Sequence, residues 1–339
     1  MNYAGIDLAN RASALCVLDD SGRVLLERMV ATERAELVEA LSGLGTLRVV
    51  IEASPLAEWL AAVLEQAGHE PVIVDARTAK QLLSATKKTD RRDAATLAEM
   101  SRTGWYTPVH RKSAPARLQR SRLQARQGVV RLHRQTRSQV RGLLRAHGIR
   151  VGRVSKGAFS DRVRRLVAEH EPGLAAYLEP LLEAHDHAVG EARRLERHLR
   201  EHARAEPVMR QMQSVPGVGP LVSQVYVATI DDPTRFANAD QLVDYIGLAP
   251  GVYQSGEVAF HGRISRRGDR LLRWHLIEAG HALLTWGPDC ALKRWGQRLA
   301  ERKGLAKAKV ALARKIAILL RRLWLTGEHF EAWPEGAAA

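Results

Sequence analysis

One sixty-residue segment of this chain is strongly basic and contains no acidic residue. Residues 101–160 carry 15 Lys and Arg side chains, a number equal to the net charge of +15 of the whole chain. Like charges at this density repel one another unless a polyanion neutralises them, and nucleic acid is the usual polyanion. The segment therefore predicts a surface that binds nucleic acid. The alternative is a solvated basic helix without a partner.

The same segment has the periodicity of a long amphipathic helix. Apolar residues recur at helical spacing from residue 113 onwards, and arginines take most other positions. We expect a helix of about 30 residues and a coiled coil. The expected buried stripe comprises Leu118, Ala125, Val129, Leu132, Thr136, Val140 and Leu143. A second helical stretch, roughly 172–204, would run antiparallel to it or join a partner subunit, so the arm suggests dimerisation. Aromatic residues are nearly absent here, which favours contact with the phosphate backbone of a duplex or a folded RNA over base stacking.

Residues 1–105 alternate strand and helix signals. Strands are expected at 2–8, 13–18, 23–30, 47–52 and 70–75, and helices at 32–43, 55–67, 76–86 and 89–103. Three strands in succession, followed by strands interleaved with helices, indicate an α/β domain with a mixed sheet.

Four carboxylates in this domain could converge on a metal ion. Asp7 and Glu52 stand at the ends of two apolar strands, and Asp90 and Asp93 share one face of a helix because they are three residues apart. Such acids suit Mg²⁺, which prefers oxygen ligands and leaves room for a phosphate. Alternatively, Asp90 and Asp93 are first-turn acids that follow a Thr89 N-cap. The cations beside them, which suggest an anionic substrate, are Lys87, Lys88, Arg91 and Arg92.

Two further motifs lie in the mostly helical unit formed by residues 206–330. VPGVGP has the Gly-x-Gly turn of a helix-hairpin-helix, in which the backbone at Gly217 and Gly219 could approach a phosphate; the alternative is a tight turn without a ligand. Ser255 in a Ser-Gly turn could attack a phosphodiester if cations surround it, although no adjacent histidine is an obvious base and His261 is better explained as a surface or packing residue. The cations that follow are Arg263, Arg266, Arg267 and Arg270.

The remaining signals concern the compartment. Cys16 and Cys290 cannot form a disulfide framework and have no zinc-site spacing. The N-terminus lacks the pattern of a signal peptide, and charged residues interrupt the longest apolar stretch, residues 309–325, so no membrane span is expected. These features predict a soluble protein of a reducing compartment.

Taken together, these segments resemble the one-ten family of insertion-sequence transposases over nearly the whole chain. The matching blocks are GIDLA, the Glu of IEAS, KKTDRRDAATLA, VPGVGP and QSGE…GRISRRGDR, while the arm matches in character only. Glu52 is followed by Ala-Ser-Pro where the family has Ala-Thr-Gly or similar. This departure concerns the shape of the loop and spares the acid.

The resemblance implies a RuvC-like, RNase-H-fold domain (1–108), a helical coiled-coil arm (109–205), a serine-bearing transposase domain (206–330) and a disordered tail (331–339). It implies that Asp7, Glu52, Asp90 and Asp93 form an Asp-Glu-Asp-Asp site for Mg²⁺, expected as a pair of ions that Mn²⁺ could replace. Ser255 would be the nucleophile and would form a covalent phosphoserine with DNA.

The resemblance further implies a structured bridge RNA that pairs with donor and target DNA, and a Holliday-junction-like intermediate. Dimers would pair into tetramers, with the RuvC-like and serine domains of different subunits forming one site. The expected location is the bacterial cytoplasm, at the nucleoid.

Three other functions remain open from the residues. The first is a RuvC-like nuclease in which water attacks the phosphate and Ser255 is a turn residue. The second is a non-catalytic protein that packages RNA or DNA, with the acids acting as helix caps. The third, an actin-like ATPase, is disfavoured because residues 1–105 lack further phosphate-binding glycine loops.

Overall fold

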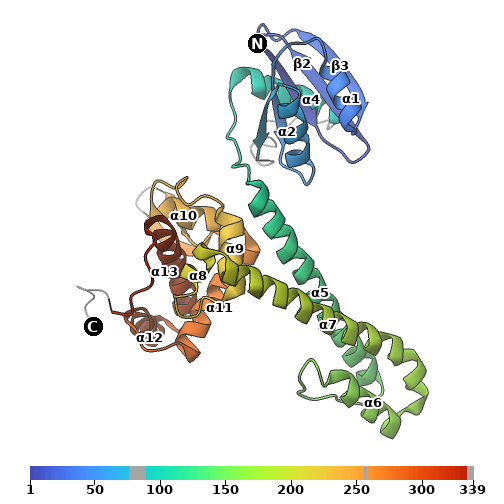
Figure 1. The fold of residues 1–339 in the computed structure, drawn as a ribbon, viewed down its shortest axis with the longest axis vertical. Coiled ribbons are helices and arrows are strands. Elements are labelled where there is room, and N and C mark those ends of the chain that lie inside the picture. Colours follow the sequence, from blue (N-terminus) through green and yellow to red (C-terminus); the bar gives the residue numbers. More distant parts are fainter. Residues whose placement is uncertain (76–88, 256–257, 334–339) are drawn as a thin grey trace. The chain divides into compact units, whose positions relative to one another are not determined.

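The chain forms two compact units, Met1–Lys112 and Ser113–Ala339 (Figure 1). The structure is a computed structural model that describes residues 1–75, 89–255 and 258–333, without the side chains of residues 252–261. The predicted boundaries at residues 108, 205 and 330 stay predictions. The predicted helix at 76–86 and most of the predicted disordered tail lie outside the described residues.

The first unit is built on a mixed five-stranded sheet, as the strand and helix signals predicted. The strand order is β3-β2-β1-β4-β5; β1 pairs antiparallel with β2 and parallel with β4. β2 pairs antiparallel with β3, and β4 pairs parallel with β5. The elements are β1 (Asn2–Asp7), β2 (Ala12–Leu18), β3 (Val24–Ala31), α1 (Arg34–Leu41), β4 (Leu47–Glu52), α2 (Ala57–Gln66), β5 (Glu70–Val74) and α4 (Asp90–Thr103).

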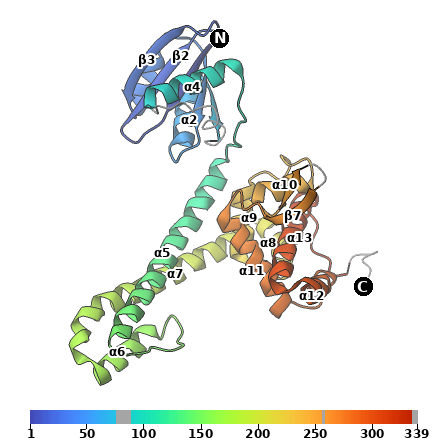
Figure 2. The same cartoon turned by 180° about the vertical axis from the view of Figure 1, so that it is seen from behind.

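Helices cover both faces of this sheet. Side chains alternate between the two faces of a strand, so Ala4 and Ile6 of β1 pack into a core with α1 and α2. On the opposite face, Val50 of β4 packs against Leu97 and Met100 of α4. Figures 1 and 2 show the two sides, with α1 and α2 in front in the first and α4 in front in the second.

Gly5 lets α4 lie unusually close to β1. A Cβ atom at this position would lie only 2.2 Å from the carbonyl oxygen of Ala94 and 2.2 Å from the backbone nitrogen of Ala98. No side chain fits between the strand and the helix here, so glycine determines how near the first turns of α4 come to the end of β1.

The second unit consists of helices and one β-hairpin. The hairpin was not predicted, because its glycine-rich sequence carries no clear alternation of apolar and polar residues. The elements are α5 (Ala114–Ala146), α6 (Phe159–His170), the 3₁₀ helix η1 (Pro172–Leu174), α7 (Ala175–Ala205), α8 (Pro207–Met212), α9 (Pro220–Ile230), α10 (Ala239–Ile246), β6 (Pro250–Ser255), β7 (Val258–Ile264), α11 (Arg270–Trp286), α12 (Ala291–Lys303) and α13 (Leu305–Thr326).

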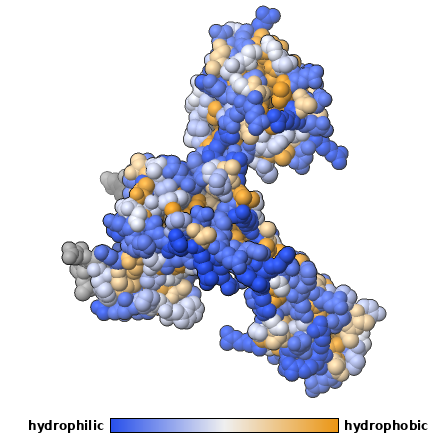
Figure 3. Space-filling view, in the orientation of Figure 1, coloured by the Kyte–Doolittle hydropathy of each residue, from blue (hydrophilic) through white to orange (hydrophobic). Residues whose placement is uncertain are grey.

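Helices α5 and α7 run antiparallel and form an arm. The rings of His133 on α5 and His185 on α7 lie 5.9 Å apart, while Arg126, nearer the start of α5, pairs with Glu196, nearer the end of α7. Figure 3 shows hydrophilic residues over much of this arm. Helix α5 has 33 residues, close to the predicted length of about 30. Of the two predicted arrangements for the second helical stretch, the antiparallel one is observed within the chain.

The predicted buried stripe of α5 was largely wrong. Leu118, Leu132 and Leu143 are 54%, 51% and 46% exposed, whereas the buried side chains belong to a neighbouring face. That face comprises Ala116, Gln119, Leu123, Val130, His133, Thr136, Val140 and Leu144. Polar residues in the buried face conceal the apolar period; one of them, Gln119, donates a buried hydrogen bond of 2.6 Å to Gln224 of α9.

The core of the second unit joins α9, α11 and α13. Tyr226 of α9 is fully buried and donates a 2.7 Å hydrogen bond to the backbone oxygen of Ala317 in α13. The arm is tied to this core by an ion pair of 2.6 Å between Arg120 and Asp269, the N-cap residue of α11. Within the described residues, every helix is too short or too polar to cross a membrane.

Candidate active site and nucleic-acid surface

The sheet register makes Asp7 and Glu52 neighbours. Strands β1 and β4 are adjacent and parallel, and Ile6 is opposite Ile51, so each carboxylate follows at the carboxyl end of its strand. Both residues belong to the face covered by α4, because Asp7 is two positions after Gly5 and Glu52 is two positions after Val50.

The first turn of α4 supplies the other two acids. The helix begins at Asp90, and the N-cap hydroxyl of Thr89 accepts a hydrogen bond of 3.4 Å from the backbone N–H of Arg92. Asp93 is only 7% exposed and precedes Leu97, which packs on the sheet, by one turn. Asp90 is exposed. Asp93 therefore faces the sheet near the ends of β1 and β4, while Asp90 lies one turn earlier along the same helix.

Asp7 and Glu52 end adjacent strands on the side of the sheet that α4 covers, and the first turn of α4 carries Asp90 and Asp93. In the part of the chain that the structure describes, no three His, Cys, Asp or Glu side chains are close enough together to hold a metal ion. The donors are all hard oxygen atoms on adjacent elements, and this chemistry fits a divalent ion such as Mg²⁺.

The predicted cations beside the acids divide into two pairs. Arg91 and Arg92 are exposed on the first turn of α4. Lys87 and Lys88 lie outside the described residues, so their placement stays a prediction. The candidate acids of α4 therefore have two exposed guanidinium groups on the same helical turn.

Ser255 lies at the tip of the hairpin in the second unit. It is the last residue of β6, and its backbone pairs with Val258, the first residue of β7. Sequence reasoning identified the turn and did not identify the two strands that carry it.

A tightly packed loop follows the hairpin and carries arginines. Gly247 and Gly268 both have positive φ angles, 72° in each case, and a Cβ atom on Gly247 would lie 1.9 Å from the carbonyl oxygen of Arg267. Arg266 has a φ of 56°, uncommon for a residue with a side chain. The backbone between β7 and α11 thus packs closely against the end of α10. This packing determines the positions of the Cα atoms that carry the arginine side chains.

These arginines line a cationic groove of about 1120 Å³. Three of the four predicted arginines contribute to it, namely Arg263, Arg266 and Arg270, whereas Arg267 is exposed outside the lining. Four residues that sequence reasoning missed also line the groove: Arg273, Trp274, Lys307 and Arg314. Helical spacing was the signal that could have found them. On α11, Arg273 and Trp274 come three and four residues after Arg270 and so share its face. On α13, Lys307 and Arg314 are two turns apart.

The VPGVGP turn connects α8 with α9. A Cβ atom on Gly217, whose φ is 89°, would lie 2.3 Å from the carbonyl oxygen of Ala279 in α11, so close packing is sufficient to explain this glycine. Gly219 has open space around its Cα atom and precedes the first residue of α9. A phosphate contact at this turn stays a prediction, better supported at Gly219 than at Gly217.

Comparison with known proteins identifies the class of the chain. Residues 4–149 match the family profile described as "Transposase" with a DEDD domain, and residues 209–295 match "Transposase IS116/IS110/IS902 family". The chain belongs to this IS110-type family of transposases, and its first unit is an RNase H-like α/β domain of the DEDD nuclease type. A DEDD domain implies the use of a divalent metal, and a transposase implies binding of DNA.

Individual relatives match over almost the full chain. The "Transposase for insertion sequence element IS1111A" of Coxiella burnetii is 29% identical over 96% of this chain and 90% of its own length. A Pseudomonas aeruginosa protein described as "Probable family 20 transposase" is 30% identical over 94% of this chain and 96% of its own length. The "Transposase for insertion sequence element IS1328" of Yersinia enterocolitica is 22% identical over 83% of each.

Proposed function

We propose that this transposase cuts and rejoins the DNA strands of its own element with a metal-bound carboxylate site and a serine nucleophile. The observation that carries the proposal is the parallel register of β1 and β4 beneath α4. It makes Asp7 and Glu52 neighbours at the carboxyl ends of their strands, while the buried Asp93 lies in the first turn of α4, on the same side of the sheet. These four residues would hold Mg²⁺, which would polarise the scissile phosphate and stabilise the leaving oxygen.

The serine would carry the covalent step. Its Oγ would attack the DNA phosphorus and form an O–P bond, and the hydroxyl proton would pass to water. The bond from phosphorus to the leaving deoxyribose oxygen would break, and that oxygen would take up a proton from water. The resulting ester would keep the bond energy needed for rejoining. The groove beside the hairpin supports this role, since Arg263, Arg266 and Arg270 could neutralise the charge of the phosphate in the transition state.

We further infer that the basic arm holds the structured guide RNA or DNA by its backbone. Arg141 lies close to Arg137 and Arg145, and burial followed by repulsion from these two residues lowers the pKa of the Arg141 guanidinium. The guanidinium groups of Arg137 and Arg141 donate to backbone oxygens 3.0 and 2.7 Å away, which fixes them beside Arg153. Such crowded cations suit a polyanion.

The assembly would be a dimer that pairs into a tetramer, with the first unit of one subunit serving the serine of another. An exposed apolar row on α5, which includes Leu118, Leu132 and Leu143, supports a coiled-coil contact between copies. The protein would act in the cytoplasm on chromosomal DNA.

A strand-cleavage assay on DNA from the element's ends, with and without its flanking non-coding RNA, tests the proposal. Asp93→Asn should abolish Mg²⁺-dependent cleavage while leaving DNA binding intact. Ser255→Ala should also abolish cleavage. Normal cleavage by Ser255→Ala would instead favour the RuvC-like nuclease, in which water attacks. Binding of nucleic acid without cleavage, unchanged by Mg²⁺ or by Asp93→Asn, would favour the non-catalytic alternative.

A further inference from the structure

A second pocket lies in the C-terminal part of the chain, away from the groove beside the hairpin. It has a volume of about 560 Å³ and is enclosed by α12, α13 and the backbone of residues 330–332. This volume falls in the range of about 300–1000 Å³ that is typical of small-ligand sites. Sequence reasoning assigned none of its lining residues to a site and placed two of them, Glu331 and Ala332, in the predicted disordered tail.

The walls of this pocket are fixed by packing. Gly296 of α12 faces Leu312 of α13 so closely that a Cβ atom would lie 2.7 Å from a methyl group of Leu312, and this sets the spacing of the two helices. The third wall, the backbone of residues 330–332, is held by a hydrogen bond at each end. The N–H of Ala291 donates to the backbone oxygen of Ala332 at 3.0 Å, and the N–H of Phe330 donates to the hydroxyl of Ser214 at 3.0 Å.

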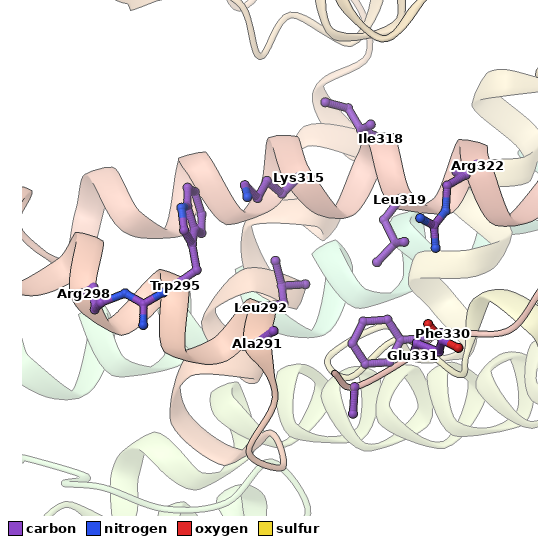
Figure 4. Close-up of a pocket in the computed structure, with 11 residues that line it drawn as sticks. Ala291, Leu292, Trp295, Arg298, Lys315, Ile318, Leu319, Arg322, Phe330 and Glu331 are labelled. Carbon is purple, nitrogen blue, oxygen red and sulfur yellow. The ribbon is translucent and has the colours of Figure 1, made fainter. Parts of the chain in front are cut away.

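The floor is apolar and carries an aromatic ring on each side. Figure 4 shows Leu292 and Leu319 between Trp295 on α12 and Phe330 on the third wall. Both rings are half-buried, so each keeps part of its surface open to the pocket. Aromatic faces of this kind stack on nucleobases of any sequence, because every base has a π-face.

The rim carries three cations and one carboxylate, that of Glu331. Arg298 lies on the Trp295 side and Arg322 on the Phe330 side, and the ammonium of Lys315 lies 4.1 Å from the centroid of the Trp295 ring. Within the described residues these three cations make no ion pair, whereas Arg294 and Arg314 nearby are paired with Asp289 and Asp240. The rim is therefore available to an anion, and Lys315 places positive charge directly beside an aromatic ring.

We propose that this pocket captures one unpaired nucleotide of a nucleic acid bound by the transposase. The base would pack on the apolar floor against Trp295 or Phe330, and its phosphates would contact Lys315, Arg298 or Arg322. A paired base is held in its stack and cannot enter, so the pocket would recognise a bulge, a loop or a strand end. The proposal requires only that the chain binds nucleic acid, and it is independent of the metal and serine chemistry.

The test compares a duplex that carries a single-nucleotide bulge with the same duplex fully paired. Contacts with the backbone contribute nearly equally to both, so the ratio of the two dissociation constants isolates the contribution of the unpaired nucleotide. RNA and DNA versions of each probe, measured with the full-length protein, distinguish the two sources of such a nucleotide.

Trp295→Leu should lower the preference for the bulged probe about tenfold, since stacking on one aromatic side chain has an effect of this order. The matched control is Trp286→Leu, because Trp286 is 76% exposed and lies outside the pocket; it should leave the ratio unchanged. Replacing Lys315 and Arg322 by Gln should lower the same preference and reduce its dependence on salt, without altering the packed core.

Cross-linking locates the contact directly. A probe with 5-iodouracil at the bulge, irradiated in complex with the protein, should label the tryptic peptide of residues 295–298 or the peptide that contains Phe330. Equal affinities for bulged and paired probes, or labelling confined to other peptides, would overturn the proposal. Loss of cleavage in the Asp93 variant with the bulge preference retained would separate this site from the catalytic one.

Discussion

Gly5 offers a sharp test of how the sheet positions the candidate acids. A methyl group at this position would lie 2.2 Å from the carbonyl oxygen of Ala94 and the nitrogen of Ala98, and 2.6 Å from the carbonyl carbon of Leu97. Contact between such atoms requires about 3.5 Å, so α4 would have to move by roughly 1 Å. All three atoms belong to the backbone, so no change of rotamer can relieve the clash.

The expected cost of Gly5→Ala is about 3 kcal/mol, at the upper end of overpacking effects. For a unit of this size the melting transition should fall by roughly 10–20 °C. Circular dichroism gives the midpoint, and hydrogen exchange should localise the loss of protection to β1 and α4. Cleavage should decline as well, because the displaced helix carries Asp93 away from Asp7.

Gly128→Ala is the matched control. It makes the same chemical change within α5, where a Cβ atom meets nothing within 4 Å. There alanine should stabilise the helix by about 0.5–1 kcal/mol. A Gly5→Ala protein that melts and exchanges like the wild type would refute the argument that the close approach fixes α4.

Further predictions follow from other parts of the chain. Asp93→Asn should keep the melting temperature within a few degrees and lose Mg²⁺-dependent cleavage, measured with the same DNA substrate; loss of folding instead would indicate a structural role. Burial, and then repulsion from Arg126, lower the pKa of His275 to about 4. As the pH falls, the unfolded state takes up a proton on His275 at a higher pH than the folded state does. The free energy of unfolding should therefore decrease by about 3 kcal/mol between pH 6.5 and 4. Urea unfolding at several pH values checks this, and His275→Gln should remove most of the dependence. Replacing Arg266 and Arg270 by Gln should weaken DNA binding and lower the salt slope of the binding constant by about 2; an unchanged slope would exclude this groove from the interface.

The sheet and the long helices could be predicted from the sequence because their local signals agree with the tertiary structure. The apolar runs at β1 and β4 are short and bounded by polar or turn residues. Thr89 caps α4 with Asp90 and Asp93 in the first turn, as the alternative explanation of these two acids supposed. The pairing of β1 with β4 was not predicted in register, and the convergence of the four acids on a metal ion stays a prediction.

Other features depend on contacts that are distant in sequence. The buried face of α5 contains Gln119 and His133, whose partners are Gln224 and His185 on other helices, so hydropathy alone selected a neighbouring face. The cationic groove and the aromatic pocket each combine two helices with a separate segment. Arg263, Arg266 and Arg270 of the groove come from one sequence block, but the other lining residues share no motif with it. Only the packing of α11, α12 and α13 brings them together.

Mapping the protein–DNA linkage tests the central claim most directly. A suicide substrate that cannot be rejoined should leave a denaturation-resistant adduct in the presence of Mg²⁺. Trypsin should release it on the peptide of residues 236–263, which contains no serine or threonine other than Ser255. The account predicts a phosphoserine at Ser255 that is absent from the Asp93→Asn protein. Cleavage at the normal rate without any covalent adduct would contradict it.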